Sequence, residues 1–186
     1  MDRSPGVDGP NSVGGDNVWF KGADGERQAI RVDSRDTHGA YSVIESVAEP
    51  GCAVPTHRHR NEEEHFLVIS GRYRIAIGDQ VLDAPPGTRA TVPRNTPHSW
   101  RNIAPEESQL LAILTPGGFE QIIYAVKDTP PEKIRDLAAG FGCDILGPPV
   151  DAALIRNLTD TLAVEQGLGE INYVGGGEAG MTSKDA

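Results

Sequence analysis

The chain has 186 residues, of which 38% are hydrophobic and 24% are charged, a composition typical of one ordinary globular domain. Its formal net charge of −10 argues against a nucleic-acid partner, because nucleic-acid-binding proteins cluster Lys and Arg. No apolar run is long enough to cross a bilayer, and residues 1–17 lack the apolar core of a signal peptide. We therefore expect a cytoplasmic protein without a membrane partner.

The first part of the chain predicts an all-β domain. Residues 1–17 are rich in Gly, Pro and Asp and predict a disordered arm. From Val18 to Pro116, short apolar segments alternate with turns, as in a β-barrel. The segments with strand character are 41–47, 64–69, 72–77, 80–82, 88–92, 98–102 and 109–114. We expect the barrel to span residues 18–116.

The pattern changes after Pro116, where short helices are expected. Residues 119–126 favour one helix, and a second begins after Pro130-Pro131 and ends near Gly140. Asp151 is suited to cap a third helix. We predict a helical extension over residues 117–166 that packs on the barrel, followed by a flexible tail over 167–186.

Two predicted strands are apolar on both faces. In residues 64–69, Phe66 and Val68 share a face with Glu64, while Leu67 and Ile69 occupy the other face. Residues 109–114 show the same pattern. An antiparallel strand with one face in water usually alternates apolar and polar residues. Either the C-terminal helices or a second subunit must cover this outer face, and we expect a homodimer.

Three of the five histidines and one glutamate follow a spacing that suits a metal site. His57 and His59 are two residues apart, so on a strand their imidazoles point to the same side. Glu64 follows after a short turn, and His98 begins a later strand. Three imidazoles and a carboxylate suit one divalent transition metal per chain (Fe, Ni, Mn, Co, Cu or Zn). Four protein ligands leave coordination positions open, which is typical of a catalytic site.

The choice among three consecutive glutamates depends on strand parity. Glu64 shares a face with the inward Phe66, whereas Glu63 would point outward. Glu62 and Glu63 are expected in a solvated charged turn. His65 is expected on the outer face.

Spaced glycines and prolines accompany these ligands. Gly51 precedes His57, Gly71 follows Glu64, and Gly87 and Pro93 precede His98. Both segments resemble the two sequence motifs of the cupin superfamily, except that Asn95 stands where the second motif usually has glycine. Asn tolerates the left-handed backbone of that position. The resemblance implies an all-β jelly-roll barrel, with metal ligands at His57, His59, Glu64 and His98.

Further stretches resemble single-barrel bacterial cupins of the quercetin 2,3-dioxygenase type. They are residues 39–43, 92–98, 114–120 and 147–149. This resemblance implies a metal-dependent dioxygenase that takes O₂ and a flavonol-like or other enolisable aromatic or diketone small molecule. It also implies that Glu64 acts both as metal ligand and as catalytic base. Because the fold does not name a reaction, two alternatives stay open. One is a non-oxidative metal enzyme (isomerase, cyclase or lyase), and the other is a small-molecule-binding protein without catalysis.

Several side chains are expected to point inward, where they either line a substrate pocket or belong to the ordinary barrel core. They are Tyr41, Val43, Phe66, Val68 and Trp100. Glu45 has two open interpretations: it supports the metal site, or it points outward and pairs with an arginine. Cys52 and Cys143 lack metal-ligand spacing and are expected to be buried, unpaired thiols.

Overall fold

The computed structural model describes residues 18–149 of the chain. Strands make up most of the regular secondary structure of these residues, as predicted. The strands are β1 (Phe20–Lys21), β2 (Glu26–Val32), β3 (Ser42–Ala48), β4 (Thr56–His59), β5 (Glu63–Ser70), β6 (Tyr73–Ile77), β7 (Gln80–Ala84), β8 (Arg89–Val92), β9 (His98–Asn102), β10 (Ser108–Thr115) and β11 (Cys143–Gly147). The helices are α1 (Gln121–Val126), the 3-10 helix η1 (Pro131–Lys133) and α2 (Ile134–Gly140).

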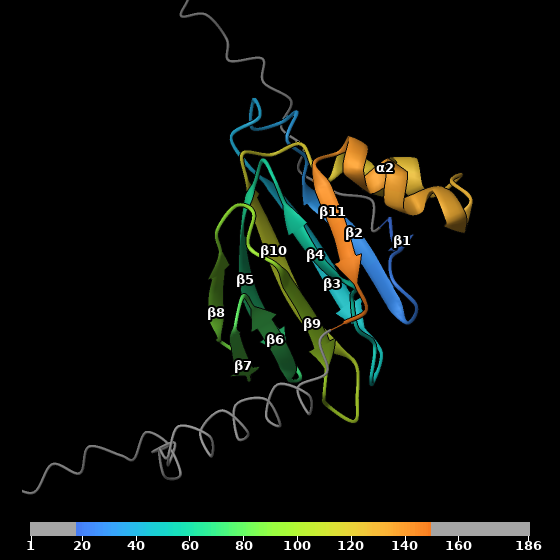
Figure 1. Cartoon of the computed structure of the whole chain (residues 1–186). Coiled ribbons are helices and arrows are strands. Elements are labelled where there is room, and N and C mark those ends of the chain that lie inside the picture. Colours follow the sequence, from blue (N-terminus) through green and yellow to red (C-terminus); the bar gives the residue numbers. More distant parts are fainter. Residues whose placement is uncertain (1–17, 150–186) are drawn as a thin grey trace, which may run out of the picture. The chain divides into compact units, whose positions relative to one another are not determined.

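The strands form two antiparallel sheets (Figure 1). The six-stranded sheet has the order β1-β2-β3-β10-β5-β8, and the five-stranded sheet has the order β11-β4-β9-β6-β7. Many neighbours in these sheets, such as β3 and β10 or β4 and β11, are far apart in sequence, as in a jelly-roll barrel. This arrangement confirms the all-β jelly-roll prediction. Within the described residues, no helix reaches the length and apolarity needed to cross a membrane.

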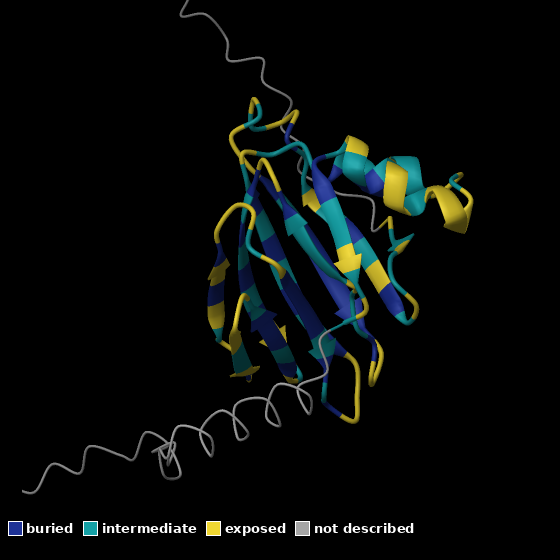
Figure 2. Cartoon of the chain, in the orientation of Figure 1, coloured by how far each residue is buried: buried dark blue, intermediate teal, exposed yellow. Residues whose placement is uncertain are grey.

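Alternating burial along β5 and β10 places the core between the sheets. Phe66 and Val68 on β5 are buried with Leu110 and Leu114 on β10. Figure 2 shows the corresponding dark bands of buried residues along the inner strands. The other face of these strands carries half-buried apolar side chains, and Ile69 is 42% exposed. The homodimer that this outer face led us to expect stays a prediction.

The region after Pro116 contains two helical segments, but it also returns to the barrel. β11 pairs with β4, with Cys143 opposite His59 and Ile145 opposite His57. We had assigned this stretch to the helical extension, because a five-residue strand ending in Gly147 shows no clear alternation. The predicted arm, the third helix and the tail lie outside the described residues.

The two cysteines are buried, free thiols, as expected. Burial raises the pKa of both Cys52 and Cys143 to about 12. Both thiols are therefore protonated and poorly nucleophilic at neutral pH.

Candidate metal centre

Three strands bring the predicted metal ligands together. β4 carries His57 and His59, β5 carries Glu64 near its start, and β9 begins with His98, which pairs with His57 across the sheet. One ligand atom from each of the four side chains lies within 4.8 Å of the others. We call these four residues the His/Glu cluster.

The side chains of the His/Glu cluster touch one another closely. Nε2 of His98 lies 2.8 Å from Oε2 of Glu64, and Nε2 of His59 lies 3.5 Å from the same oxygen. The ring centroids of His57 and His98 are 4.2 Å apart. All four donors therefore converge on one small volume, as a single metal ion requires.

Backbone carbonyls orient two of the imidazoles. Nδ1 of His57 donates to the carbonyl oxygen of Pro55 at 2.8 Å, and Nδ1 of His98 donates to that of Thr96 at 3.0 Å. A carbonyl oxygen only accepts, so each Nδ1 carries the proton when the ring is neutral. The Nε2 lone pairs are then free for a metal, which is the usual arrangement of metal-binding histidines.

Burial and mutual contacts shift the protonation of the His/Glu cluster. Burial, together with His98 and His59 nearby, lowers the pKa of His57 to about 3, so this ring is neutral at physiological pH. Burial alone would raise the pKa of Glu64, but the nearby imidazoles of His59 and His98 hold it well below its usual value. Burial also disfavours the charged form of His98, but its contact with Glu64 raises its pKa overall.

His59 gives an independent test of whether a metal fits. Both of its ring nitrogens are buried and have no hydrogen-bond partner among the described residues. Leaving a buried polar atom unpaired is costly, so such atoms usually mark a missing ion or water. A cation bound beside Nε2 would satisfy that nitrogen. The residues therefore fit a divalent metal ion.

The second motif keeps its turn despite the change from glycine. Asn95 adopts a left-handed backbone with φ of 63°, and its N–H donates to the carbonyl of His59 at 2.7 Å. This hydrogen bond ties the turn before β9 to the strand that holds two of the ligands.

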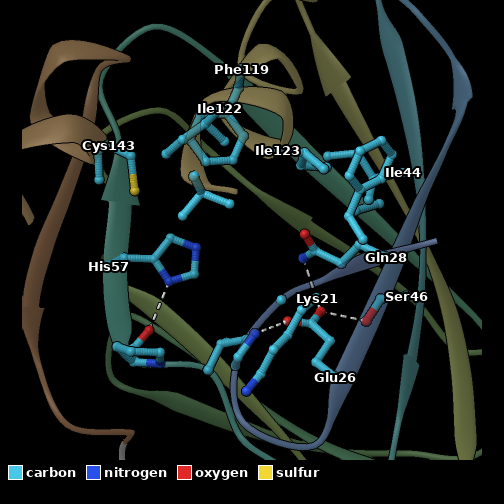
Figure 3. A pocket seen from close by; sticks show the side chains of 18 of the residues that line it. Lys21, Glu26, Gln28, Ile44, Ser46, His57, Phe119, Ile122, Ile123 and Cys143 are labelled. Atoms are coloured by element: carbon cyan, nitrogen blue, oxygen red, sulfur yellow. Dashed lines mark hydrogen bonds between the residues drawn. The ribbon is translucent and has the colours of Figure 1, made fainter. Parts of the chain in front are cut away.

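A cavity of about 950 Å³ opens beside the His/Glu cluster. His57, His59 and Glu64 contribute to its wall, together with the aromatic side chains of Phe66, Trp100 and others. Figure 3 shows part of its wall, to which α1 contributes Ile122 and Ile123 and β4 contributes His57. The volume is that of a site for a small organic molecule.

Residues 45–114 match the cupin domain family. This part of the chain is a cupin domain, and it contains all four residues of the His/Glu cluster. Over 94 residues the chain is 28% identical to the quercetin 2,3-dioxygenase of Bacillus subtilis (strain 168). The aligned segment covers 50% of this chain and 28% of that protein. The chain therefore spans less than a third of the length of this curated relative.

One solved structure supports the same fold, and a second is more distantly similar. KdgF from Halomonas sp. superposes with a TM-score of 0.51 at 15% identity, covering 56% of this chain and 90% of that one. A sugar phosphate isomerase of the cupin superfamily from Silicibacter pomeroyi DSS-3 gives a TM-score of 0.45 at 20% identity, covering 50% of this chain and 60% of that one.

The cupin cavity includes only some of the residues predicted to line it. Phe66 and Trp100 line it, whereas Tyr41, Val43 and Val68 do not. Val68 is packed in the core between the sheets. Tyr41 precedes β3 and is 41% exposed.

The face of β3 explains why Tyr41 and Val43 were misplaced. Ile44 and Ser46 line the cavity, so the even-numbered residues of this strand point inward. The predicted inward face, with Tyr41 and Val43, is the opposite one. Part of the true inner face is serine, which hydrophobicity alone assigns to solvent.

Glu45 points outward. Its carboxylate accepts hydrogen bonds from Arg31 of β2 and Gln109 of β10. The interpretation as an outward, arginine-paired glutamate therefore holds, and Glu45 takes no part in the metal site.

Glu62 corrects a second expectation. It is 5% exposed and not in a solvated turn, and its Oε2 lies 3.8 Å from Nδ1 of His59. Burial raises the pKa of Glu62 above its usual value. When Nε2 of His59 binds a metal, Nδ1 carries the ring proton and faces this carboxyl. Glu62 and Glu64 are two residues apart, so strand parity predicts that both side chains point to the same side as the metal ligands.

Other parts of the cavity wall were missed because they come from outside the motifs. Phe119 packs edge-on against His59, with ring centroids 4.3 Å apart. Glu26, Gln28 and Ser46 add a polar patch from β2 and β3. Because side chains of β2 that line the cavity are polar, the hydrophobic pattern of the sequence does not predict this patch.

Proposed function

We propose that this cupin is a metal-dependent dioxygenase that acts on a flavonol-like or related enolisable aromatic molecule. The observation that carries the proposal is that three residues of the His/Glu cluster, His57, His59 and Glu64, lie in the wall of a largely apolar, aromatic cavity. Such a cavity suits a flat, poorly hydrated ring system. The similarity to quercetin 2,3-dioxygenase over half of the chain supports the same substrate class.

The roles of the residues follow from their donor atoms. The His/Glu cluster would hold one divalent first-row metal, which supplies Lewis acidity that lowers the pKa of an enol hydroxyl. Glu64 would serve as the base, since it lines the cavity and would accept the proton of a hydroxyl whose own pKa the metal lowers. The side chains of Phe66, Trp100 and Phe119 would keep water away from the deprotonated substrate. O₂ would be the oxidant, and both of its atoms would enter the product.

A non-oxidative reaction is the second candidate function. Imidazole and carboxylate ligands accept redox-active and redox-inert metals alike. The same cluster and base would then serve an isomerase, cyclase or lyase that acts on an enolisable substrate without O₂.

The first experiment combines metal content with oxygen uptake. The protein is purified without added metal and measured by elemental mass spectrometry, and oxygen consumption is recorded with a panel of flavonols. We expect about one transition metal per chain and uptake that Glu64→Gln lowers by at least about 100-fold. Glu63→Gln is the matched control, since Glu63 neighbours Glu64 in sequence but pairs with His65.

Each other outcome has a definite meaning. Product formation without oxygen uptake would replace the dioxygenase by the non-oxidative enzyme. Metal binding with tight ligand binding but no turnover of any enol would leave a binding protein. Equal loss in Glu64→Gln and Glu63→Gln would contradict the assignment of Glu64 as base.

A further inference from the structure

A buried polar patch interrupts the apolar wall of the cavity, away from the metal ligands. It consists of Glu26 and Gln28 on β2 and Ser46 on β3, which we call the Glu26 cluster. Glu26 is 5% exposed and Ser46 is 3% exposed. Figure 3 shows Gln28 and His57 pointing toward one another from opposite sides of the open space. A buried carboxyl in a ligand-sized cavity needs an explanation, because burying it is costly.

Protein donors hold the Glu26 carboxyl in place without using all of its capacity. Oε1 accepts from Oγ of Ser46 at 2.6 Å and from Nε2 of Gln28 at 3.0 Å. Oε2 accepts from the backbone N–H of Ala23 at 2.9 Å. A carboxylate offers about four acceptor positions, so one position remains. In the described part of the chain, no hydrogen bond reaches Oε1 of Gln28.

Strand register gives the separation between the Glu26 cluster and the metal ligands. Glu64 pairs with Leu114 on β10, whereas Ser46 pairs with Leu110 on the same strand. Four residues of extended strand separate these rows, about 13 Å. β3 and β5 flank β10, so their backbones are about 10 Å apart. Phe66 lies in the row between the two polar rows.

The wall between the two polar ends is apolar. The row of Phe66 continues through Ala112 of β10 to Ile44 of β3, and all three side chains line the cavity. A ligand that reaches both ends would be on the order of 10–15 Å long. It would have a flat apolar middle and a polar group at each end, like two or three linked rings with oxygen substituents.

The charges near the Glu26 cluster select a neutral polar group. Burial raises the pKa of Glu26 above its usual value, and Glu64 across the cavity adds to the rise. A second anion there would be repelled. Lys21, a lysine of the wall, is exposed, and its Nζ lies 4.0 Å from Oδ1 of Asp24. A hydroxyl group, which donates and accepts, matches the free atoms of Gln28 and Glu26.

We propose that the Glu26 cluster is a recognition site for a hydroxyl group at the end of the substrate remote from the metal. The site names the substrate class more closely: a multi-ring enol with a neutral, hydroxylated far ring, and not a sugar phosphate or a dicarboxylate. The choice of a flavonol as the multi-ring enol rests on the proposed function. The hydroxyl preference depends only on the Glu26 cluster.

The test compares ligands that differ by one hydroxyl group. Binding of 3-hydroxyflavone, 3,7-dihydroxyflavone and 3,4′-dihydroxyflavone to the full-length protein is measured under argon, so that no oxidation occurs. Both tryptophans of the chain, Trp19 and Trp100, line the cavity, so quenching of their fluorescence reports occupancy. We expect one dihydroxy compound to bind about tenfold more tightly than 3-hydroxyflavone.

Variants assign that preference to the Glu26 cluster. Glu26→Gln and the nearly isosteric Gln28→Met should each reduce the preference to less than about threefold, while the affinity for 3-hydroxyflavone changes by less than about twofold. Glu45→Gln is the matched control, because Glu45 is a similarly buried carboxyl on the outer face of the same sheet. It should keep the full preference. Gln28→Met keeps the test valid if Glu26→Gln does not fold.

The outcomes separate this inference from the proposed function. Equal binding of all three probes to the wild type would overturn the hydroxyl site, even if oxygen uptake is observed. A preference that survives in both Glu26→Gln and Gln28→Met would overturn it as well. A preference without oxygen uptake would leave the site standing and reject only the dioxygenase. Failure of every probe to bind would reject both.

Discussion

The two polar ends of the cavity differ in how far the sequence predicts them. The His/Glu cluster is built from a pair of histidines two residues apart, a short turn and one later strand. A metal demands several donors of fixed type around one point, so few spacings serve. The residues of the Glu26 cluster are brought side by side by the register of β2 and β3. Ligand recognition there needs polar atoms on one face, and many residue types supply them. The first end is visible in the sequence, and the second becomes visible only in the structure.

The largest effect is expected at the metal end. His98→Ala removes one of four donors and should lower metal affinity by at least about 100-fold, because replacing even a supporting residue costs about 10–100-fold. Elemental mass spectrometry after gel filtration would show loss of the metal. His65→Ala is the control, since His65 faces outward and contacts Thr91. Full metal occupancy in His98→Ala would remove it from the ligand set.

A smaller effect should separate Glu62 from its neighbour. Glu62→Gln weakens the partner that faces Nδ1 of His59, so metal affinity should fall by about tenfold without loss of fold. Titration calorimetry with Zn²⁺ measures the change, and circular dichroism checks the fold. Glu63→Gln should bind Zn²⁺ like the wild type. If the two variants behave alike, Glu62 has no role in orienting His59.

The smallest effect concerns stability at the Glu26 end. A carboxyl with a raised folded-state pKa contributes stability below its unfolded pKa, near 4.5, and loses that contribution as pH rises through the folded pKa. Glu26→Gln cannot titrate. Its melting temperature relative to the wild type should therefore rise between pH 5 and pH 8, by about 2–4 °C for each kcal/mol. Scanning calorimetry across this range measures the difference. A difference that is constant with pH would show that the Glu26 carboxyl has an ordinary pKa.

The parts of the fold that were predictable have one strongly apolar face or a fixed spacing. β5 and β10 alternate in burial along their length, so the inward face of Glu64 followed from parity. β3 was located but turned the wrong way, because its inner face carries Ser42 and Ser46. Side-chain type reports burial only where the interior is apolar, and a ligand cavity is the place where it is not.

The missed elements fail for a related reason. β2 places Glu26 and Gln28 on its inner face, so its sequence does not read as a half-buried strand. β11 is short, and its place beside β4 depends on a contact between residues more than 80 positions apart. Glu62 was assigned to solvent because charged residues are rarely buried alone. The positions of β2, β11 and Glu62 depend on long-range strand register and on the polar side chains that the site requires.

The pairing of β11 with β4 also bears on where this domain can be cut. The family match ends at residue 114, yet a fragment ending there would lack β11. Without β11 the five-stranded sheet would have four strands, and β4, which carries His57 and His59, would be its edge strand. Unpaired edges recruit other chains and promote aggregation. The smallest autonomous unit that keeps its histidine strand enclosed therefore extends at least through Gly147.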